Sequence, residues 1–150
     1  MKKFIAAAAL FIMSLCFSGG ISAGNFGVLG GATFHAPSNT QWHAGLSYNM
    51  SLPLGFHIQP ALQYNALSKD TGRLELMGSV QWGVDLILFR PFVDVSPFVA
   101  YGVNDRNWGW GTGVGGGLDI WRFQIAARYN WNFVQMRDVN PVTLTLSFFF

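Results

Sequence analysis

Apolar and polar residues alternate along most of the chain beyond residue 23, which is the spacing of β-strands with two different faces. The clearest stretch is 123–133, in which one face is formed by Phe123, Ile125, Ala127, Tyr129, Trp131 and Phe133. The same period of two occurs in 41–52, 55–66, 74–89 and 142–150. Three weaker stretches, 25–34, 93–103 and 112–120, complete the pattern. The alternation predicts eight strands, an even number, as in single-chain bacterial membrane barrels.

The charged residues of these predicted strands all fall on the polar face. They are Glu75, Asp85, Asp94, Asp119 and Arg128. A cationic side chain facing lipid at the bilayer midplane costs roughly 2–4 kcal/mol, and an acidic one costs less. An apolar face without charge over eight strands therefore indicates contact with hydrocarbon.

The size of the residues also distinguishes the two faces. The apolar face carries bulky side chains, among them Trp42, Tyr64, Trp82, Tyr129 and Trp131, whereas the other face is rich in Gly, Ser, Gln and Asn. Eight strands enclose only enough space for side chains to fill, so the large aromatic residues are expected outside. The sequence thus predicts an all-β fold, an eight-stranded antiparallel up-and-down transmembrane β-barrel.

The connections between the predicted strands alternate in length. Polar connections at 35–40, 67–72, 102–111 and 135–141 alternate with tight links around 53–54, 90–91 and 121–122. With both termini in the periplasm, the longer set would be extracellular. Trp108 and Trp110 lie in the longest connection, where we expect them to anchor the loop at the lipid headgroups, although binding a sugar or host surface is an alternative.

Two prolines and the N-terminal segment need separate explanations. Pro60 and Pro97 fall inside predicted strands, so we expect a bulge or local break at each. Residues 1–23 combine a basic start, a short apolar run and a final Ala23, and are expected to be a cleaved signal peptide. The barrel domain would then be 24–150.

The charge and cysteine content of the barrel domain exclude several classes of function. The net charge of +2 comes from Lys2 and Lys3, so residues 24–150 are formally neutral and carry no basic patch for nucleic acid. The one cysteine, Cys16, lies in the expected signal peptide, which excludes disulfides and thiol chemistry from the barrel.

Three motifs carry a resemblance to a known family. They are the alternating Val142, Leu144, Leu146, Phe148 and Phe150 at the C-terminus, the stretch 97–102, and the glycines at 111, 113, 115 and 117. The chain resembles the small outer-membrane β-barrels of the outer membrane protein X and A transmembrane-domain type, including a porin-like branch. This resemblance implies a location in the outer membrane of a Gram-negative bacterium, contact with its lipids and lipopolysaccharide, and a C-terminal pattern read by the outer-membrane assembly machinery.

Few residues suggest catalysis or metal binding. His43 and His57 face the predicted lumen but are separated by roughly 13 Å at the usual rise per residue, too far to share a metal. The stretch 128–132 is similar to a late strand of lipid A deacylases, but it lacks the His and Ser that family needs. His35 and Ser38 lie in the first loop, where the palmitoyltransferase type has an extracellular His with Asp and Ser. We expect no cofactor, no metal and no enzymatic activity.

The lumen charges permit two interpretations. Arg128 is predicted to be the lone base inside the barrel, with Asp85, Asp94 and Asp119 as partners. These residues could form a gate in a narrow pore or a structural network that neutralises buried charge. We expect a structural or surface-interaction protein, with a narrow porin-like channel and a lipid A-modifying enzyme as the alternatives.

Overall fold

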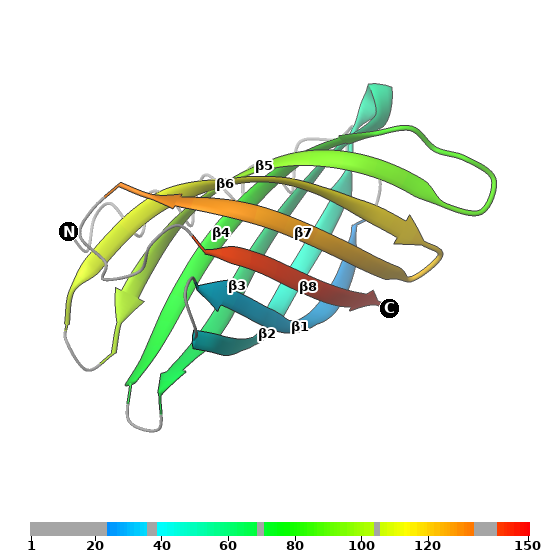
Figure 1. Ribbon diagram of the computed structural model, residues 1–150. Helices are drawn as coiled ribbons and strands as arrows, with labels where there is room; N and C mark the ends of the chain where they lie inside the picture. The colour runs from blue at the N-terminus through cyan, green and yellow to red at the C-terminus, as the bar shows by residue number, and fades with distance from the viewer. Residues whose placement is uncertain (1–23, 36–38, 69–70, 104–105, 134–140) are drawn as a thin grey trace.

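The computed structural model describes residues 24–35, 39–68, 71–103, 106–133 and 141–150. These residues form one closed barrel of eight strands, in which each strand pairs with its neighbours in the chain and the last pairs with the first (Figure 1). All pairings are antiparallel. The predicted fold class is confirmed. The expected signal peptide, 1–23, lies outside the described residues.

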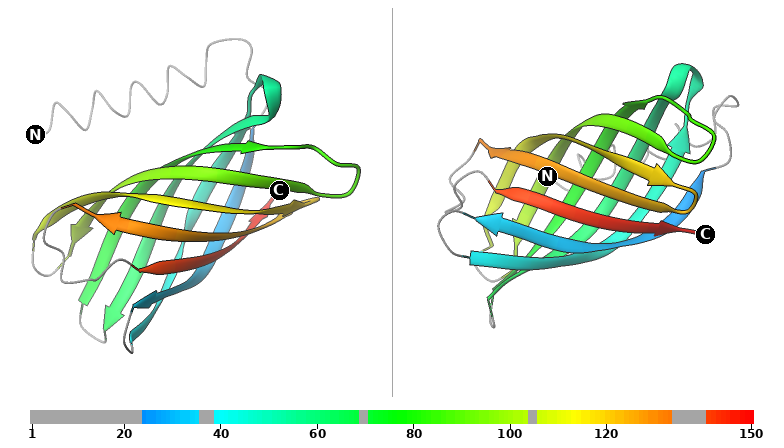
Figure 2. Two further views of the ribbon diagram at one scale, coloured as in Figure 1. Left: turned by 45° about the horizontal axis from the view of Figure 1, so that its top comes forward. Right: turned by 45° about the vertical axis from the view of Figure 1, so that its right-hand side comes forward.

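The strands run obliquely around the barrel, as two further views show (Figure 2). They are β1 (Asn25–His35), β2 (Asn39–Ser51), β3 (Phe56–Ser68), β4 (Thr71–Gly83), β5 (Arg90–Gly102), β6 (Trp108–Ile120), β7 (Phe123–Asn132) and β8 (Val142–Phe149). A single 3₁₀ turn, η1 (Pro53–Gly55), joins β2 to β3. No helix among the described residues is long and apolar enough to cross a membrane.

The two ends of the barrel differ. We call the end that holds Asn25, Phe149 and the links 52–55, 84–89 and 121–122 the terminal mouth. There the backbone N–H of Phe150 donates to the carbonyl of Phe26 at 2.9 Å, which holds the two ends of the sheet together. The opposite end, where β1, β3, β5 and β7 finish, is called the loop mouth.

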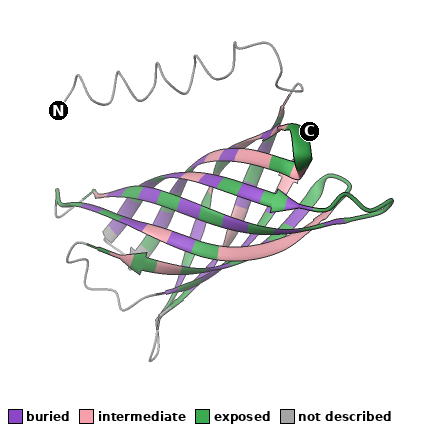
Figure 3. Cartoon of the chain, turned by 90° about the horizontal axis from the view of Figure 1, so that it is seen from above, coloured by how far each residue is buried: buried purple, intermediate pink, exposed green. Residues whose placement is uncertain are grey.

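The burial pattern agrees with a membrane-facing exterior. Buried and exposed residues alternate along the strands (Figure 3). The apolar set is the exposed one, with Trp42 69% exposed and Leu46 59% exposed, whereas Gln81 and Ser96 are fully buried. The predicted outward orientation of the five large aromatic residues is confirmed, since Trp42, Tyr64, Trp82, Tyr129 and Trp131 are all exposed.

Several predicted strand boundaries differ from the structure, and two of them differ most. β4 ends at Gly83 rather than at residue 89, so Asp85 lies in the turn to β5. Within this turn, the backbone N–H of Val84 donates to the carbonyl of Pro91 and that of Leu86 to the carbonyl of Phe89. β6 begins at Trp108 rather than at residue 112. Trp108 and Trp110 are therefore exposed strand residues, not loop residues. Gly109 and Gly111 are inward positions of this strand, and because glycine has no side chain they obscured the alternation in the sequence.

Both prolines interrupt the pairing on one side of their strand without shifting its register. Between β2 and β3 the paired residues step from Ser47↔Ala61 to Met50↔Ile58, and Pro60 lies in the gap. Between β4 and β5 they step from Met77↔Phe98 to Val80↔Val95, and Pro97 lies in the gap. Because proline has no N–H to donate, this local break is the one expected from the sequence.

The exposed apolar face predicts a cost of charge that depends on depth. Leu46 lies in the middle of β2, so Leu46→Arg should reduce the free energy of unfolding in lipid vesicles by roughly 2–4 kcal/mol. Thr40→Arg, also outward but near the end of the same strand, should cost only about 0–1 kcal/mol. Denaturant titration of both variants measures the difference, and equal costs at the two positions would contradict a bilayer around the barrel.

Candidate functional site: the lumen network

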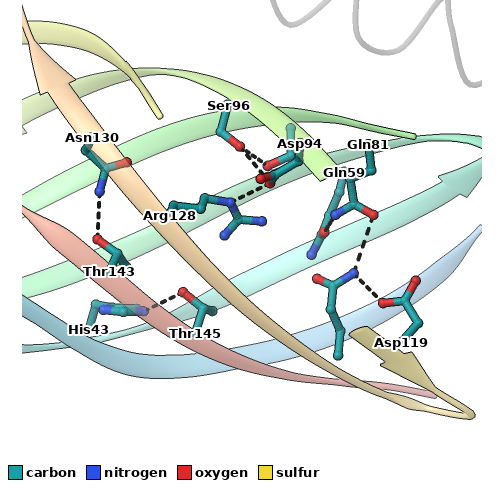
Figure 4. A network of polar contacts seen from close by, with 12 residues as sticks. His43, Gln59, Gln81, Asp94, Ser96, Asp119, Arg128, Asn130, Thr143 and Thr145 are labelled. Carbon is teal, nitrogen blue, oxygen red and sulfur yellow. Dashed lines mark hydrogen bonds and ion pairs between the residues drawn. The ribbon is translucent and has the colours of Figure 1, made fainter. Parts of the chain in front are cut away.

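The centre of the lumen holds a buried ion pair between β5 and β7. The Nε of Arg128 donates to Oδ2 of Asp94, and the two side chains are only 3% and 0% exposed (Figure 4). The hydroxyl of Ser96 donates to the same oxygen at 3.0 Å. Because Ser96 donates its one proton there, Ser79 must donate in the 2.7 Å contact between the two serines. The acid is thus fixed by direct partners on β5 and β7, and Ser79 on β4 supports it through Ser96.

A glycine on β6 makes this pair possible. Gly115 lies between the two charged residues, paired with Asp94 on one side and with Arg128 on the other. A Cβ at Gly115 would lie 2.7 Å from Cγ of Arg128 and 2.2 Å from the carbonyl oxygen of Ala127. The missing side chain therefore leaves space for the arginine beside β6.

A second charged group lies toward the loop mouth. Glu75 is buried and accepts hydrogen bonds from Gln63 at 2.9 Å, Arg73 at 3.2 Å and Asn65 at 3.4 Å. Arg73 is itself buried. Arg73 thus neutralises the buried carboxylate of Glu75, and Gln63 and Asn65 donate its other hydrogen bonds.

The third charged group lies near the terminal mouth. Arg90 donates to Asp119 at 2.8 Å and to the carbonyl of Gly55 at 2.9 Å, and it lies 3.5 Å from Asp85. Gln124 donates to Asp119 at 2.8 Å and approaches Gln81 at 3.5 Å. Gln81 in turn donates to Gln59 (Figure 4). The chain of amides links this group to the interior.

The histidines contact hydroxyl and amide groups rather than each other. His43 lies 3.1 Å from the hydroxyl of Thr145 and 3.4 Å from that of Thr33. His57 lies 3.1 Å from Oδ1 of Asn49. In the part of the chain that the structure describes, no three His, Cys, Asp or Glu residues are grouped as metal ligands. Between β2 and β3, His43 pairs with Asn65 and His57 pairs with Ser51.

The predicted lumen residues are thus divided among three groups rather than one network. Glu75, Asp94 and Arg128 are buried inside, and Asp119 is partly exposed near the terminal mouth. The placement of Asp85 inside the lumen is wrong, because its side chain is 75% exposed in the turn. Burial of Arg73 and Arg90 also corrects the prediction that Arg128 is the lone base. Both were missed because the predicted strands began after them. Arg73 lies two residues before Glu75 and Arg90 lies four residues before Asp94, so each arginine shares a strand face with a lumen acid.

Apolar side chains fill part of the lumen as well. Leu29, Ala61, Met77, Phe98 and Ala100 form a buried cluster of inward residues. A cavity of about 650 Å³ opens at the terminal mouth, whereas the one beside Arg73 and Glu75 holds only about 10 Å³. The residues lining these two cavities do not overlap.

Comparisons with known proteins identify the fold but no family. No protein-family model and no curated protein matches the sequence. Solved structures do match. A de novo designed transmembrane β-barrel is 16% identical with a TM-score of 0.60, covering 86% of this chain and 98% of its own. Neisserial surface protein A is 10% identical with a TM-score of 0.63, covering 87% and 99%. The outer membrane enzyme PagL is 14% identical with a TM-score of 0.55, covering 83% and 97%. The chain therefore has the fold of a transmembrane β-barrel, and proteins with that fold differ in activity.

The buried pair predicts strong coupling between two residues. Asp94→Asn leaves Arg128 charged and uncompensated, so it should lower the free energy of unfolding by about 3–5 kcal/mol. The same change at the exposed Asp85 should cost about 0–1 kcal/mol. Adding Arg128→Met to Asp94→Asn should recover part of the loss. Denaturant unfolding in micelles measures all three variants, and a double variant that is no more stable than Asp94→Asn would contradict the pairing.

Proposed function

We propose that this chain is an integral outer-membrane β-barrel protein with a closed lumen and a structural or surface-interaction role, without catalysis. The observation that supports this most strongly is that apolar residues face outward and charged residues face inward, the opposite of the arrangement in a water-soluble protein. Leu46, Val95 and Leu146 are each half-exposed or more on the outer face, whereas Asp94, Glu75 and Arg128 are buried within. In water such a surface would far exceed the apolar patches that soluble monomers expose, but in a bilayer it is solvated.

The proposal that the lumen is closed rests on how its charges are arranged. Asp94, Glu75 and Asp119 each have an arginine partner, so none is left to attract a passing ion. The apolar cluster around Phe98 and Met77 adds a barrier that water and ions cross poorly. Eight strands also leave little space for a continuous channel.

The remaining expectations follow from the membrane location. Termini in the periplasm would place the loop mouth at the cell surface, in contact with lipopolysaccharide, and the terminal mouth toward the assembly machinery. The ring of Trp108 packs at a tilt against that of Tyr101, with centroids 4.9 Å apart, and Trp110 packs in the same way against Phe133 at 4.8 Å, all near the loop mouth. Such paired aromatic rings suit the headgroup region, which supports anchoring rather than sugar binding.

A narrow channel is the second candidate, because the cavity at the terminal mouth reaches Arg90 and Asp119. In planar bilayers the purified barrel should give no discrete current steps in concentrated KCl, while a porin reconstituted in parallel does. Repeated steps of uniform size that scale with salt concentration would replace the closed-lumen proposal with the channel. A lipid A modification assay on cells expressing the gene should likewise detect no change.

The C-terminal strand predicts a defect of assembly rather than of folding. Val142, Leu144, Leu146, Phe148 and Phe150 lie on the outer face of β8 and at its end, with Phe150 exposed. Phe150→Ser should reduce the amount of barrel recovered in outer-membrane fractions several-fold. Refolding of the same purified variant into detergent micelles should be unchanged, since Phe150 is not a lumen residue. Equal losses in both experiments would mean that Phe150 acts on barrel stability alone.

A further inference from the structure

The outer wall of the barrel has a recess where three strands lack bulk in adjacent positions. Pro60 on β3 pairs with Gly78 on β4. Between β4 and β5 the flanking pairs are Met77↔Phe98 and Val80↔Val95, and this register places Gly78 opposite Pro97. All three positions belong to the outward face, like Leu76 and Val80 on the same strand. Across the sheet, a proline, a glycine and a second proline thus lie side by side on the outward face.

The middle position of the recess, Gly78, has no side chain to fill it. A Cβ built on Gly78 would meet no atom within 4 Å, whereas most glycines of this barrel lie against a neighbour. Ile58, Leu76, Val99 and Trp110 stand around it, and the cavity has a volume of about 460 Å³. Almost all of its lining is apolar, and the lining includes Met77 and Phe98 of the buried cluster, so the recess continues the lipid-facing surface into the wall of the barrel.

We propose that this recess binds one acyl chain of a membrane phospholipid. Hydrocarbon is the solvent on this face if the barrel spans a membrane, so the inference rests on the proposed function. Water would gain too few hydrogen bonds there to occupy an apolar site. The volume is on the order of fifteen times the ~30 Å³ that a water-sized group occupies in a liquid, which suits one extended chain.

The arrangement of residues favours a linear chain over a bulky partner. Pro60 and Pro97 flank Gly78 in the lining, which also includes Leu76 and Trp110. A flexible chain can adapt to such an irregular surface and restore the dispersion contacts that an empty recess would lose. Recognition would depend on the chain and not on the headgroup, because polar atoms contribute little to the lining.

Filling the recess tests the proposal directly. Gly78→Leu places a side chain in the open space, and Gly30→Leu is the matched control because its Cβ would meet only the carbonyl oxygen of His43, at 3.7 Å. Gly30 also faces outward, but on β1. Native mass spectrometry from micelles containing phosphatidylethanolamine measures the fraction of barrel that retains one lipid.

We expect the unaltered protein and Gly30→Leu to retain one phospholipid, and Gly78→Leu to retain at least about tenfold less. Displacing two buried methylene groups already corresponds to roughly that factor. Phosphatidylglycerol with the same acyl chains should bind equally well, and shorter chains more weakly. Equal retention by Gly78→Leu, retention that follows the headgroup, or retention of lipopolysaccharide in place of phospholipid would each overturn the proposal.

Two further measurements keep failure of folding separate from loss of binding. The free energy of unfolding of Gly78→Leu should be no lower than that of the unaltered protein, because leucine is better suited than glycine to a lipid-facing strand. Val99→Trp narrows the recess from β5 and should lose the lipid in the same way. An inserted barrel that retains no phospholipid overturns only this inference, whereas a barrel that does not enter micelles or vesicles overturns the proposed function too.

Discussion

Closure of the sheet is the constraint on which the rest of this structure depends. Hydrocarbon offers no hydrogen bonds, so every backbone N–H and C=O in the bilayer must find a partner in the chain. Pairing β8 with β1 removes both sheet edges, and alternation then fixes which residues face outward. Once the apolar side faces lipid, the polar side chains, charged ones included, are enclosed together in a narrow lumen.

The narrow lumen explains the local chemistry of its charges. A buried carboxylate without partners is costly, so Asp94, Glu75 and Asp119 each contact an arginine and at least one neutral donor. Space is as important as charge, because Arg128 reaches across β6 beside Gly115. Gly115 therefore contributes to the ion pair, although it carries no functional group.

On the outer face, residues without bulky side chains leave a recess in the surface. Pro60 and Pro97 interrupt the sheet ladder on one side each, and Gly78 between them leaves open space where a side chain would lie. These positions weaken the sheet by removing donors and side-chain packing. Binding of an acyl chain would restore some of the lost packing contacts, so lipid would compensate for the irregular pairing at the two prolines.

The sequence by itself determined the strand number, the outward face and the inward placement of Glu75, Asp94 and Arg128, because a period of two depends only on neighbouring residues. It also located the irregularity at both prolines. The tertiary structure alone decided which charges meet: Arg73 with Glu75, Arg90 with Asp119 and Arg128 with Asp94. Pairing across strands depends on register and on strand ends, and alternation contains neither, which is why Asp85 was misplaced and Trp108 was assigned to a loop.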